Sequence, residues 1–421
     1  LLNLALQEVI NFGRDNYQRA IEFLKKKLEL LKHRNDKVNQ EARIRTLNNI
    51  GYCYYMMHDY LQARDYFTQA WDYAASPDVN DLGGIFSTIM NISDLYAFLM
   101  DYKPMLLAEP EKSVNTVIQR MVAYKDSYEK NRFVQERIKL EADAKAKKRT
   151  IEEKELNALR KRIKVNAQSI YYSIDIAVGI LKCYHAEQIY TQKSGGKGLD
   201  PTEYHAYNKQ LFDLYSDARK RFENALVEAD KKISKRLMVK LLLNLGTTQK
   251  RMGMIDDAYT SYLNAETIGK NMAYEDLNWV VYQKLGNILR EHGQGLEGSG
   301  YTSLAEGYYL KAVRLVKTEP YLYMDKFHQV SALMDEYADF LIHKGAVKRA
   351  LEQLELKSAI GRVQLVMKDF PDFARAEDRK NYKQYRDITR SISILKRILS
   401  SKLEKGEPLN SDKIKKVQKD L

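Results

Sequence analysis

Residues 47–70 read LNNIGYCYYMMHDYLQARDYFTQA and contain no Pro and no strand-like alternation of apolar and polar residues. Small residues recur at fixed places, with Gly51 twelve positions before Ala63. The aromatic residues Tyr54 and Phe67 keep fixed distances from them. Apolar positions spaced three and four residues apart are typical of helices that bury one face. The stretch therefore predicts two helices joined by a short turn.

The same frame of small and aromatic residues recurs along the chain. Self-similarity of this kind is the sequence signature of a repeat architecture. Two partial copies lie at 89–96 and 218–225. The fuller copies, each given as small, small and large residue, are Gly51, Ala63 and Phe67; Gly246, Ala258 and Tyr262; Gly286, Ala305 and Tyr309; and Ala338, Ala350 and Leu354.

This frame resembles the tetratricopeptide repeat (TPR), a helix–turn–helix unit of about 34 residues. The resemblance implies an all-α fold, a TPR-like α-solenoid of antiparallel helical hairpins that forms a right-handed superhelix. No single unit can bury its apolar face alone, so neighbouring units must stack. From the spacing we expect Gly51 and Ala63 to lie where the two helices cross, because small residues let backbones approach closely. Tyr54 and Phe67 would fill the wedge between helices.

The middle of the chain departs from this frame. Residues 129–164 hold 20 charged residues and no Pro or Gly, which predicts one long exposed helix over 129–165. An apolar helix at 169–190 and a helix over about 202–233 should follow as enlarged hairpins. We expect four domains: 1–114 with N-terminal repeats, 115–233 with enlarged charged hairpins, 234–360 with C-terminal repeats, and 361–421 with C-terminal helices, one of them at 381–403, and a basic tail.

Two segments supply the net charge of +13. Residues 379–421 carry 13 basic and 5 acidic side chains, and residues 129–164 carry 13 and 7. Such segments can attract nucleic acid, anionic lipid or an acidic protein, although most are solvated helix faces. A nucleic-acid binder that uses these basic segments therefore stays open as an alternative function.

The sequence contains no pattern that predicts catalysis, a metal site or a cofactor. The seven histidines show no HExxH or paired spacing. Cys53 and Cys183 lie in apolar helical patterns, so we expect buried thiols. Gly293, Gly295 and Gly298 match GxGxxG, but a helix and not a strand precedes them, which favours an inserted loop. No run of about 18 apolar residues was found, so no membrane span is expected.

Five residues on the first helices of the units are candidates for binding a partner protein. Asn49, Asn91 and Asn244 each stand two residues before the small residue of their unit. An amide there bonds either a partner's backbone or a neighbouring helix, since buried amides need partners. Tyr52 and Asn287 occupy the ninth place of their helices, and a tyrosine there would be a good protein-binding anchor.

The expected function is that of a non-catalytic protein–protein interaction scaffold, which binds a peptide or helix in the concave surface of the solenoid. In the TPR family, a two-carboxylate clamp uses a Lys at the fifth place and an Asn at the ninth. No unit here has that pair, so the resemblance does not extend to the clamp.

Residues 346–401, with the run ALEQLELKSAIGRVQLV, resemble the helical stretch after the TPRs of proteins that end in a caspase-like (CHAT) peptidase domain. This resemblance implies a second alternative, a regulatory or sensor module of a larger enzyme. The chain begins Leu1-Leu2-Asn3 inside a helical pattern, so we expect further sequence upstream. A cytoplasmic location is favoured and an exported form stays open; the oligomeric state is not predicted.

Overall fold

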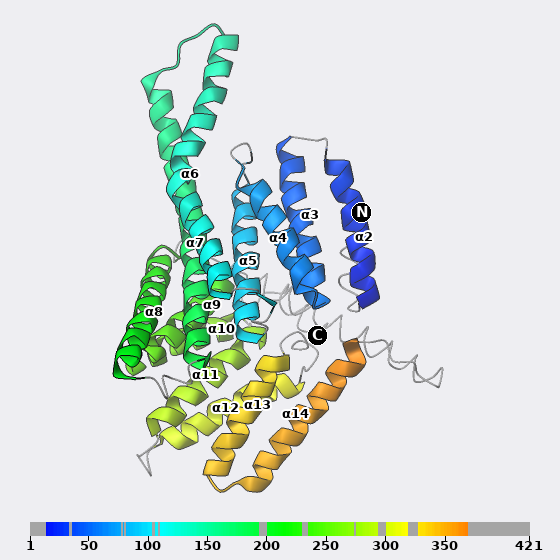
Figure 1. Ribbon diagram of the computed structural model, residues 1–421, viewed down its shortest axis with the longest axis vertical. Helices are drawn as coiled ribbons and strands as arrows, with labels where there is room; N and C mark the ends of the chain where they lie inside the picture. The colour runs from blue at the N-terminus through cyan, green and yellow to red at the C-terminus, as the bar shows by residue number, and fades with distance from the viewer. Residues whose placement is uncertain are drawn as a thin grey trace. The chain divides into compact units, whose positions relative to one another are not determined.

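The computed structural model describes residues 14–32, 36–76, 79, 81–102, 106–107, 110–192, 200–229, 235–272, 275–293, 300–318 and 327–368. These residues are 91% helical, form 13 helices and contain no strand (Figure 1). The prediction of an all-α chain is therefore confirmed. The chain divides into two compact units, Leu1–Glu228 and Ala229–Leu421.

In the first unit, neighbouring helices pack in series. Helices α2 to α5 each pack against the next one, and α3 also contacts α5. Helix α5 then packs mainly against α7, which also pairs with α6. The elements are α2 (Arg14–Leu31), α3 (Lys37–Met56), α4 (Tyr60–Ala74), α5 (Leu82–Tyr102), α6 (Pro110–Ala146), α7 (Glu153–Gln192) and α8 (Pro201–Ala229).

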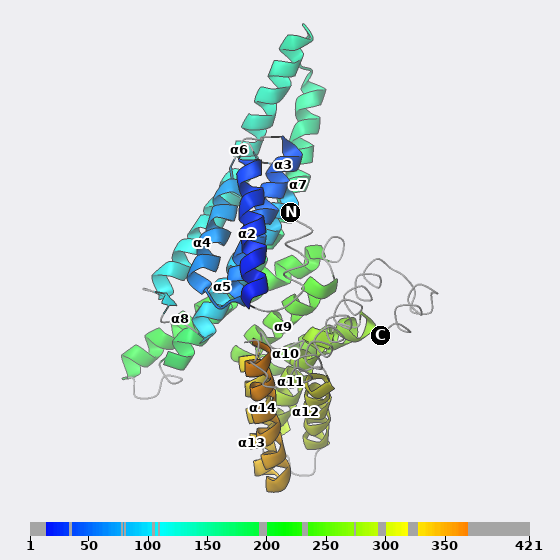
Figure 2. The same ribbon diagram turned by 90° about the vertical axis from the view of Figure 1, so that its right-hand side faces the viewer.

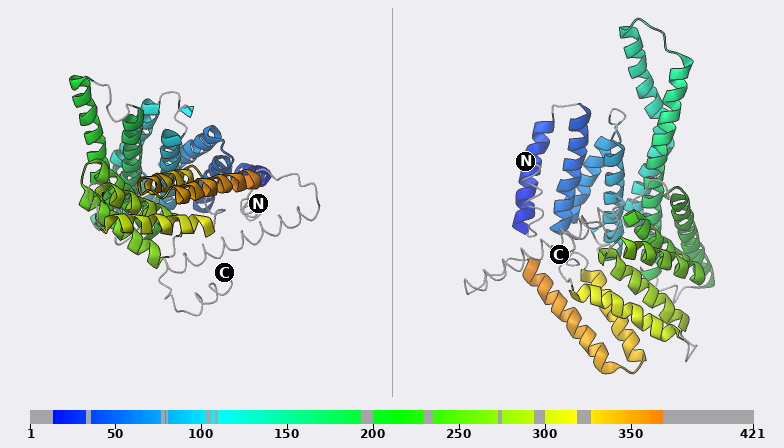
Figure 3. Two further views of the ribbon diagram at one scale, coloured as in Figure 1. Left: turned by 90° about the horizontal axis from the view of Figure 1, so that it is seen from below. Right: turned by 180° about the vertical axis from the view of Figure 1, so that it is seen from behind.

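The second unit has the same serial packing. Each helix from α9 to α14 packs against the next, and α11 also contacts both α9 and α13. Figure 3 shows the helices of each unit side by side from two further directions. The elements are α9 (Lys235–Arg251), α10 (Ile255–Asn271), α11 (Glu275–Gly293), α12 (Tyr301–Thr318), α13 (Phe327–His343) and α14 (Val347–Lys368).

The division into four domains stays a prediction. The boundary between the two compact units, after residue 228, lies close to the expected boundary after residue 233. The expected boundary after residue 114 falls inside the first unit, within α6. The predicted helix at 381–403 and the basic tail lie outside the described residues.

In four helix pairs, a glycine of the first helix lies against an aromatic ring of the second. A Cβ atom added to Gly51 would stand 2.6 Å from the Phe67 ring, and one added to Gly246 would stand 2.5 Å from the Tyr262 ring. The other two pairs are Gly179 with Phe222 and Gly286 with Tyr309. At Gly51, Gly246 and Gly179 a larger residue would collide with the ring, whereas at Gly286 the added atom would make a tight contact of 3.2 Å.

This contact adds a detail to the expectation from the sequence, which placed Gly51 and Ala63 at the helix crossing and Phe67 in the wedge between helices. The atoms nearest to a Cβ added at Gly51 belong to the Phe67 ring. Ala63 is fully buried. For the pair of Gly179 and Phe222, the sequence pattern indicated only the second helix, through the partial copy at 218–225. The residues around Gly179 do not match the first-helix pattern.

The turn between the two helices of a pair is also repeated. His58, Gly253 and Gly345 each lie seven residues after the small residue of their unit, with φ of 62°, 77° and 73°. In every case this residue's N–H donates to the carbonyl three residues back, and the following N–H donates to the carbonyl five residues back. This left-handed ending is a common helix C-terminus. Three units therefore share their backbone turn as well as their residue spacing.

The longest described helices are α6, with 37 residues, and α7, with 40. Their joined ends project beyond α2 to α5 as an arm, seen from two sides in Figures 1 and 2. An enlarged middle of long helices is thus present. The single helix expected over 129–165 is wrong, because the chain reverses between Ala146 and Glu153.

Local contacts explain the reversal at the tip of the arm. Lys148 adopts a left-handed conformation with φ of 51°. The guanidinium of Arg149 bonds the Glu155 carboxylate at 2.7 Å. The same carboxylate accepts the Glu152 backbone N–H at 3.0 Å, as the third residue of a helix does in a capping box. These contacts end α6 and begin α7 within a segment that helix propensity alone would continue.

One stretch of α5, Leu82–Met100, is long and apolar enough to cross a membrane, with a mean hydropathy of 1.3. The sequence analysis did not single out this stretch. Of the most apolar window, 56% is buried inside the protein, where α5 packs against α3, α4 and α7. The central helix of a protein core passes the same test of length and composition, so the stretch is weak evidence for a span.

Candidate interaction surface

Polar side chains connect the first helices of successive pairs in the first unit. The Asn48 amide, which is buried, donates to the Thr88 hydroxyl of α5 at 2.8 Å. The Asn91 amide of α5 donates back to the Asn48 side-chain oxygen at 3.1 Å. These hydrogen bonds satisfy groups that burial would otherwise destabilise. They fix the register of α3 against α5.

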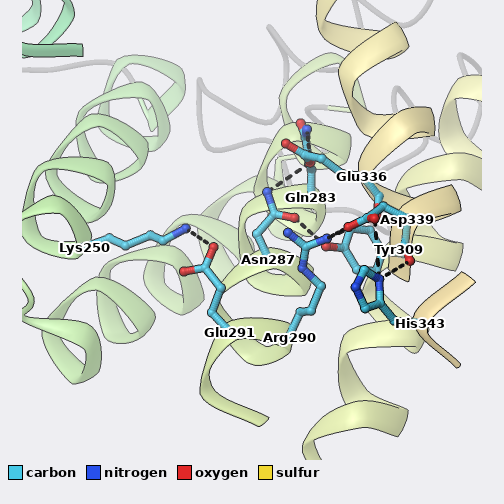
Figure 4. A network of polar contacts seen from close by, with 9 residues as sticks. All are labelled: Lys250, Gln283, Asn287, Arg290, Glu291, Tyr309, Glu336, Asp339 and His343. Atoms are coloured by element: carbon cyan, nitrogen blue, oxygen red, sulfur yellow. Dashed lines mark hydrogen bonds and ion pairs between the residues drawn. The ribbon is translucent and has the colours of Figure 1, made fainter. Parts of the chain in front are cut away.

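A larger network connects α11 with α13 in the second unit (Figure 4). One Glu336 carboxylate oxygen accepts the amide of Gln283 at 2.6 Å and the amide of Asn287 at 3.0 Å. The hydroxyl of Tyr309 donates to the side-chain oxygen of Asn287. Arg290 donates to the Glu336 carbonyl at 3.4 Å and to Asp339 at 3.2 Å. The Asn287 side chain is therefore both donor and acceptor within the fold.

Both networks follow one positional rule. Asn48 and Gln283 stand three residues before the small residue of their unit, and Asn91 and Glu336 stand two residues before it in the next unit. The side chain three residues before the small residue of one unit forms a hydrogen bond with the side chain two residues before the small residue of the next unit. This rule accounts for the polar residues Asn91 and Glu336 at the second place.

Three of the five predicted residues form hydrogen bonds within this chain. Two of them belong to the networks described above, and the third bonds its own helix. Asn91 and Asn287 bond neighbouring first helices, and for Asn91 this is the second of the two alternatives that the sequence left open. Asn244 donates to the Lys240 carbonyl of its own helix at 3.0 Å. A partner-binding role for the three amides stays a prediction, and their present partners belong to this chain.

The other two predicted residues lie near each other on α3. Asn49 is half-buried, and its side chain makes no hydrogen bond with any described residue. The Tyr52 side chain lies on the surface, with 42% of its area exposed. Of the five candidates, these two are the best placed to meet another molecule.

Sequence analysis missed Asn48 and Glu336 as members of the networks and gave Gln283 no role. The usable signal was the position of each residue relative to the small residue of its unit. That signal gains meaning only when the contact between successive first helices is known, because these pairs lie 43 and 53 residues apart in the chain.

Burial and ion pairing shift the pKa values of titratable groups in the helix pairs. Cys53 and Cys183 are buried, as expected, and burial raises the pKa of the Cys53 thiol to about 12. Such a thiol is a poor nucleophile. Burial opposes ionisation of Glu306, but hydrogen bonds from Lys344 and Arg349 lower its pKa overall. Within the described ranges, no group of three or more His, Cys, Asp or Glu side chains is arranged to hold a metal ion.

A scan against protein-family models found no match, and a search of curated proteins found none either. Inferences about function therefore depend on the geometry described above.

Proposed function

We propose that this chain is a non-catalytic interaction scaffold of the TPR type, which binds a peptide or helix of a partner protein within a larger assembly. The observation that carries the proposal is the repeated turn, with the same two hydrogen bonds and the same positive φ in three helix pairs. Chains that repeat one helical hairpin stack it into extended surfaces, and such surfaces serve recognition. We also propose that the stacked hairpins form a right-handed superhelix.

The binding surface in this proposal is the exposed side of the first helices, beginning at α3. Tyr52 would be an anchor there, because an aromatic ring with a polar tip supplies a large contact area at little entropic cost. Asn49, three residues before it on α3, would bond the backbone of the bound segment. The neighbouring amides of Asn48 and Asn91 keep this part of the helix in place.

Site-specific photocrosslinking tests this proposal. A benzoylphenylalanine replaces Tyr52 in one sample and Leu61 of α4 in another; both side chains are 42% exposed. We expect position 52 to crosslink one defined partner segment and position 61 not to. In a complex rebuilt with that partner, Tyr52→Ala should weaken binding about tenfold, the effect of an anchor residue, and Leu61→Ala should leave it unchanged. Equal crosslinking from both positions would contradict the proposal.

A nucleic-acid binder is the second candidate, and the arm of α6 and α7 is the feature that favours it. Lys145, Lys148 and Lys154 are exposed near the tip. Other cations of the arm already pair with acids, among them Arg137 with Glu141 at 2.7 Å. Affinity for a DNA duplex that falls steeply with salt would support this candidate, and no binding at low salt would exclude it.

A regulatory or sensor module of a larger enzyme is the third candidate. It rests on the resemblance of residues 346–401, most of which lie outside the described part of the chain. The photocrosslinking experiment also addresses it, because a sensor module would crosslink its own enzyme.

A further inference from the structure

A groove of about 700 Å³ lies between α4 and α6, and residues of α5 form part of its floor. At one end the two helices meet, because Trp71 packs against the Tyr124 ring with centroids 5.1 Å apart. An ion pair of Arg120 with Asp72 joins α4 and α6 at the same end. From there the groove runs toward the first turns of both helices. Its volume is in the range of pockets that bind small molecules or a few side chains.

The floor of the groove is apolar and its walls carry cations. Trp71, Ile92 and Met121 are buried at the floor. Arg64 of α4 and Lys112 and Arg120 of α6 line the walls, and Asp65 is the one acid among the lining residues. A groove with this lining suits a molecule that is apolar in one part and negatively charged in another.

The two arginines have partners that a ligand could replace. Arg64 bonds Asp65 at 3.2 Å, and half of the Asp65 side chain is exposed. The Asp72 partner of Arg120 is also exposed. Exposed ion pairs of this kind contribute little to stability, so exchanging them for a ligand carboxylate costs little.

Tyr96 of α5 lies in the groove between the two arginines. It is 8% exposed, and its hydroxyl makes no hydrogen bond with a described residue. Burial raises the pKa of Tyr96, and the charges of Arg64 and Arg120 oppose that rise. The phenol thus stands close to cations from both walls as a donor without an acceptor. Solvent reaches the hydroxyl oxygen, so a ligand oxygen can reach it as well.

We propose that this groove binds a peptide segment of a protein partner that presents a carboxylate beside an apolar side chain. The carboxylate lies between Arg64 and Arg120 and accepts the Tyr96 hydroxyl, while the apolar side chain covers Trp71 and Met121. A nucleic acid fits less well, because its phosphates would meet Asp65 and leave the apolar floor uncovered. The site is separate from the first-helix surface around Tyr52 and does not depend on it.

Saturation-transfer NMR with two matched peptides tests the proposal. The probes are acetyl-Leu-Glu-Glu-Leu-amide and acetyl-Leu-Gln-Gln-Leu-amide, titrated against the full chain. We expect the leucine methyl groups of the acidic peptide to receive saturation, and its dissociation constant to be about fivefold lower than that of the amide peptide. This ratio is the effect of about one charge-assisted hydrogen bond.

Variants of the groove assign the binding to these residues. The double variant Arg64→Gln with Arg120→Gln should bind both peptides equally, and Tyr96→Phe should weaken the acidic peptide about twofold. Arg45→Gln on α3 is the matched control, since it also removes an exposed arginine from an ion pair. It should preserve the fivefold preference. Far-ultraviolet circular dichroism and thermal melting should show every variant folded.

Three results would overturn the proposal: no saturation of either peptide, equal binding of both peptides to the unmodified chain, or a preference that survives in the double variant. Because Tyr52→Ala leaves the groove intact, failure here and failure of the first-helix surface give distinguishable results.

Discussion

At the scale of single residues, polar side chains on the first helices hold successive helix pairs together. Amides on the first helices, among them Asn91 and Asn287, suggested sites for a partner. The structure shows Asn91 and Asn287 bonded to side chains of neighbouring first helices, at 3.1 and 3.0 Å. A buried amide that loses its partners costs more than an exposed one. Replacing the same residue type should therefore change the free energy of unfolding by very different amounts at different positions.

Replacing Asn287 by Ala should lower the free energy of unfolding by about 2 kcal/mol. The change removes the acceptor of the Tyr309 hydroxyl and one donor to Glu336, and it leaves a buried hydroxyl unpaired. Asn244→Ala is the control, since that amide donates to the Lys240 carbonyl of its own helix. It should cost less than about 0.5 kcal/mol. Urea unfolding measures both, and equal losses would contradict the structural role of Asn287.

At the scale of elements, the helix pair is defined by its turn and by the contact of a glycine with a ring. The turn residue must have positive φ, which glycine adopts without steric cost. Two units use Gly253 and Gly345, and one uses His58. The histidine keeps a contact of its own there, a hydrogen bond of 2.6 Å between its Nδ1 atom and the Tyr60 hydroxyl.

Gly253→Ala should destabilise the protein by about 1 kcal/mol, because alanine is strained at a φ of 77°. Gly307→Ala, inside α12, should have the opposite sign and stabilise by about 0.5–1 kcal/mol. Both glycines have open space where a Cβ atom would stand, so steric crowding does not account for the difference in stability between the two variants. Thermal or urea unfolding gives the sign of each change. A stabilising Gly253→Ala would show that the turn is not left-handed.

At the scale of the whole molecule, two compact units each contain their own series of helices. The first has buried apolar residues on every helix from α2 to α8, and the second has them on every helix from α9 to α14. In arrays of stacked hairpins, stability is a sum of local terms and of contacts between neighbours. A local defect should therefore be felt most strongly in its own unit.

Calorimetry should resolve two unfolding transitions, one for each unit. Gly51→Ala should lower the first unit's transition and Gly246→Ala the second unit's, each by roughly 4–8 °C for a cost of about 2 kcal/mol. The two changes are matched, because an added Cβ atom would stand 2.6 or 2.5 Å from an aromatic ring. If both variants shifted one and the same transition, the units would not unfold separately.

The sequence by itself determined that the chain is all-α, where most helix pairs lie and that Cys53 and Cys183 are buried. Those features follow from local spacing, because apolar and small residues three, four and seven positions apart define a helix face before any tertiary contact forms. The reversal at Lys148 was missed, since most residues of the charged segment around it have high helix propensity.

Only the tertiary structure decided which ring covers Gly51, which amides join one helix pair to the next and where α4 and α6 enclose a groove. Each of these features depends on residues that lie 16 to 57 positions apart. Helical periodicity gives the face on which a side chain lies and not the neighbour that it meets. Packing selects that neighbour, because a close-packed interior admits few arrangements of rings, glycines and paired amides.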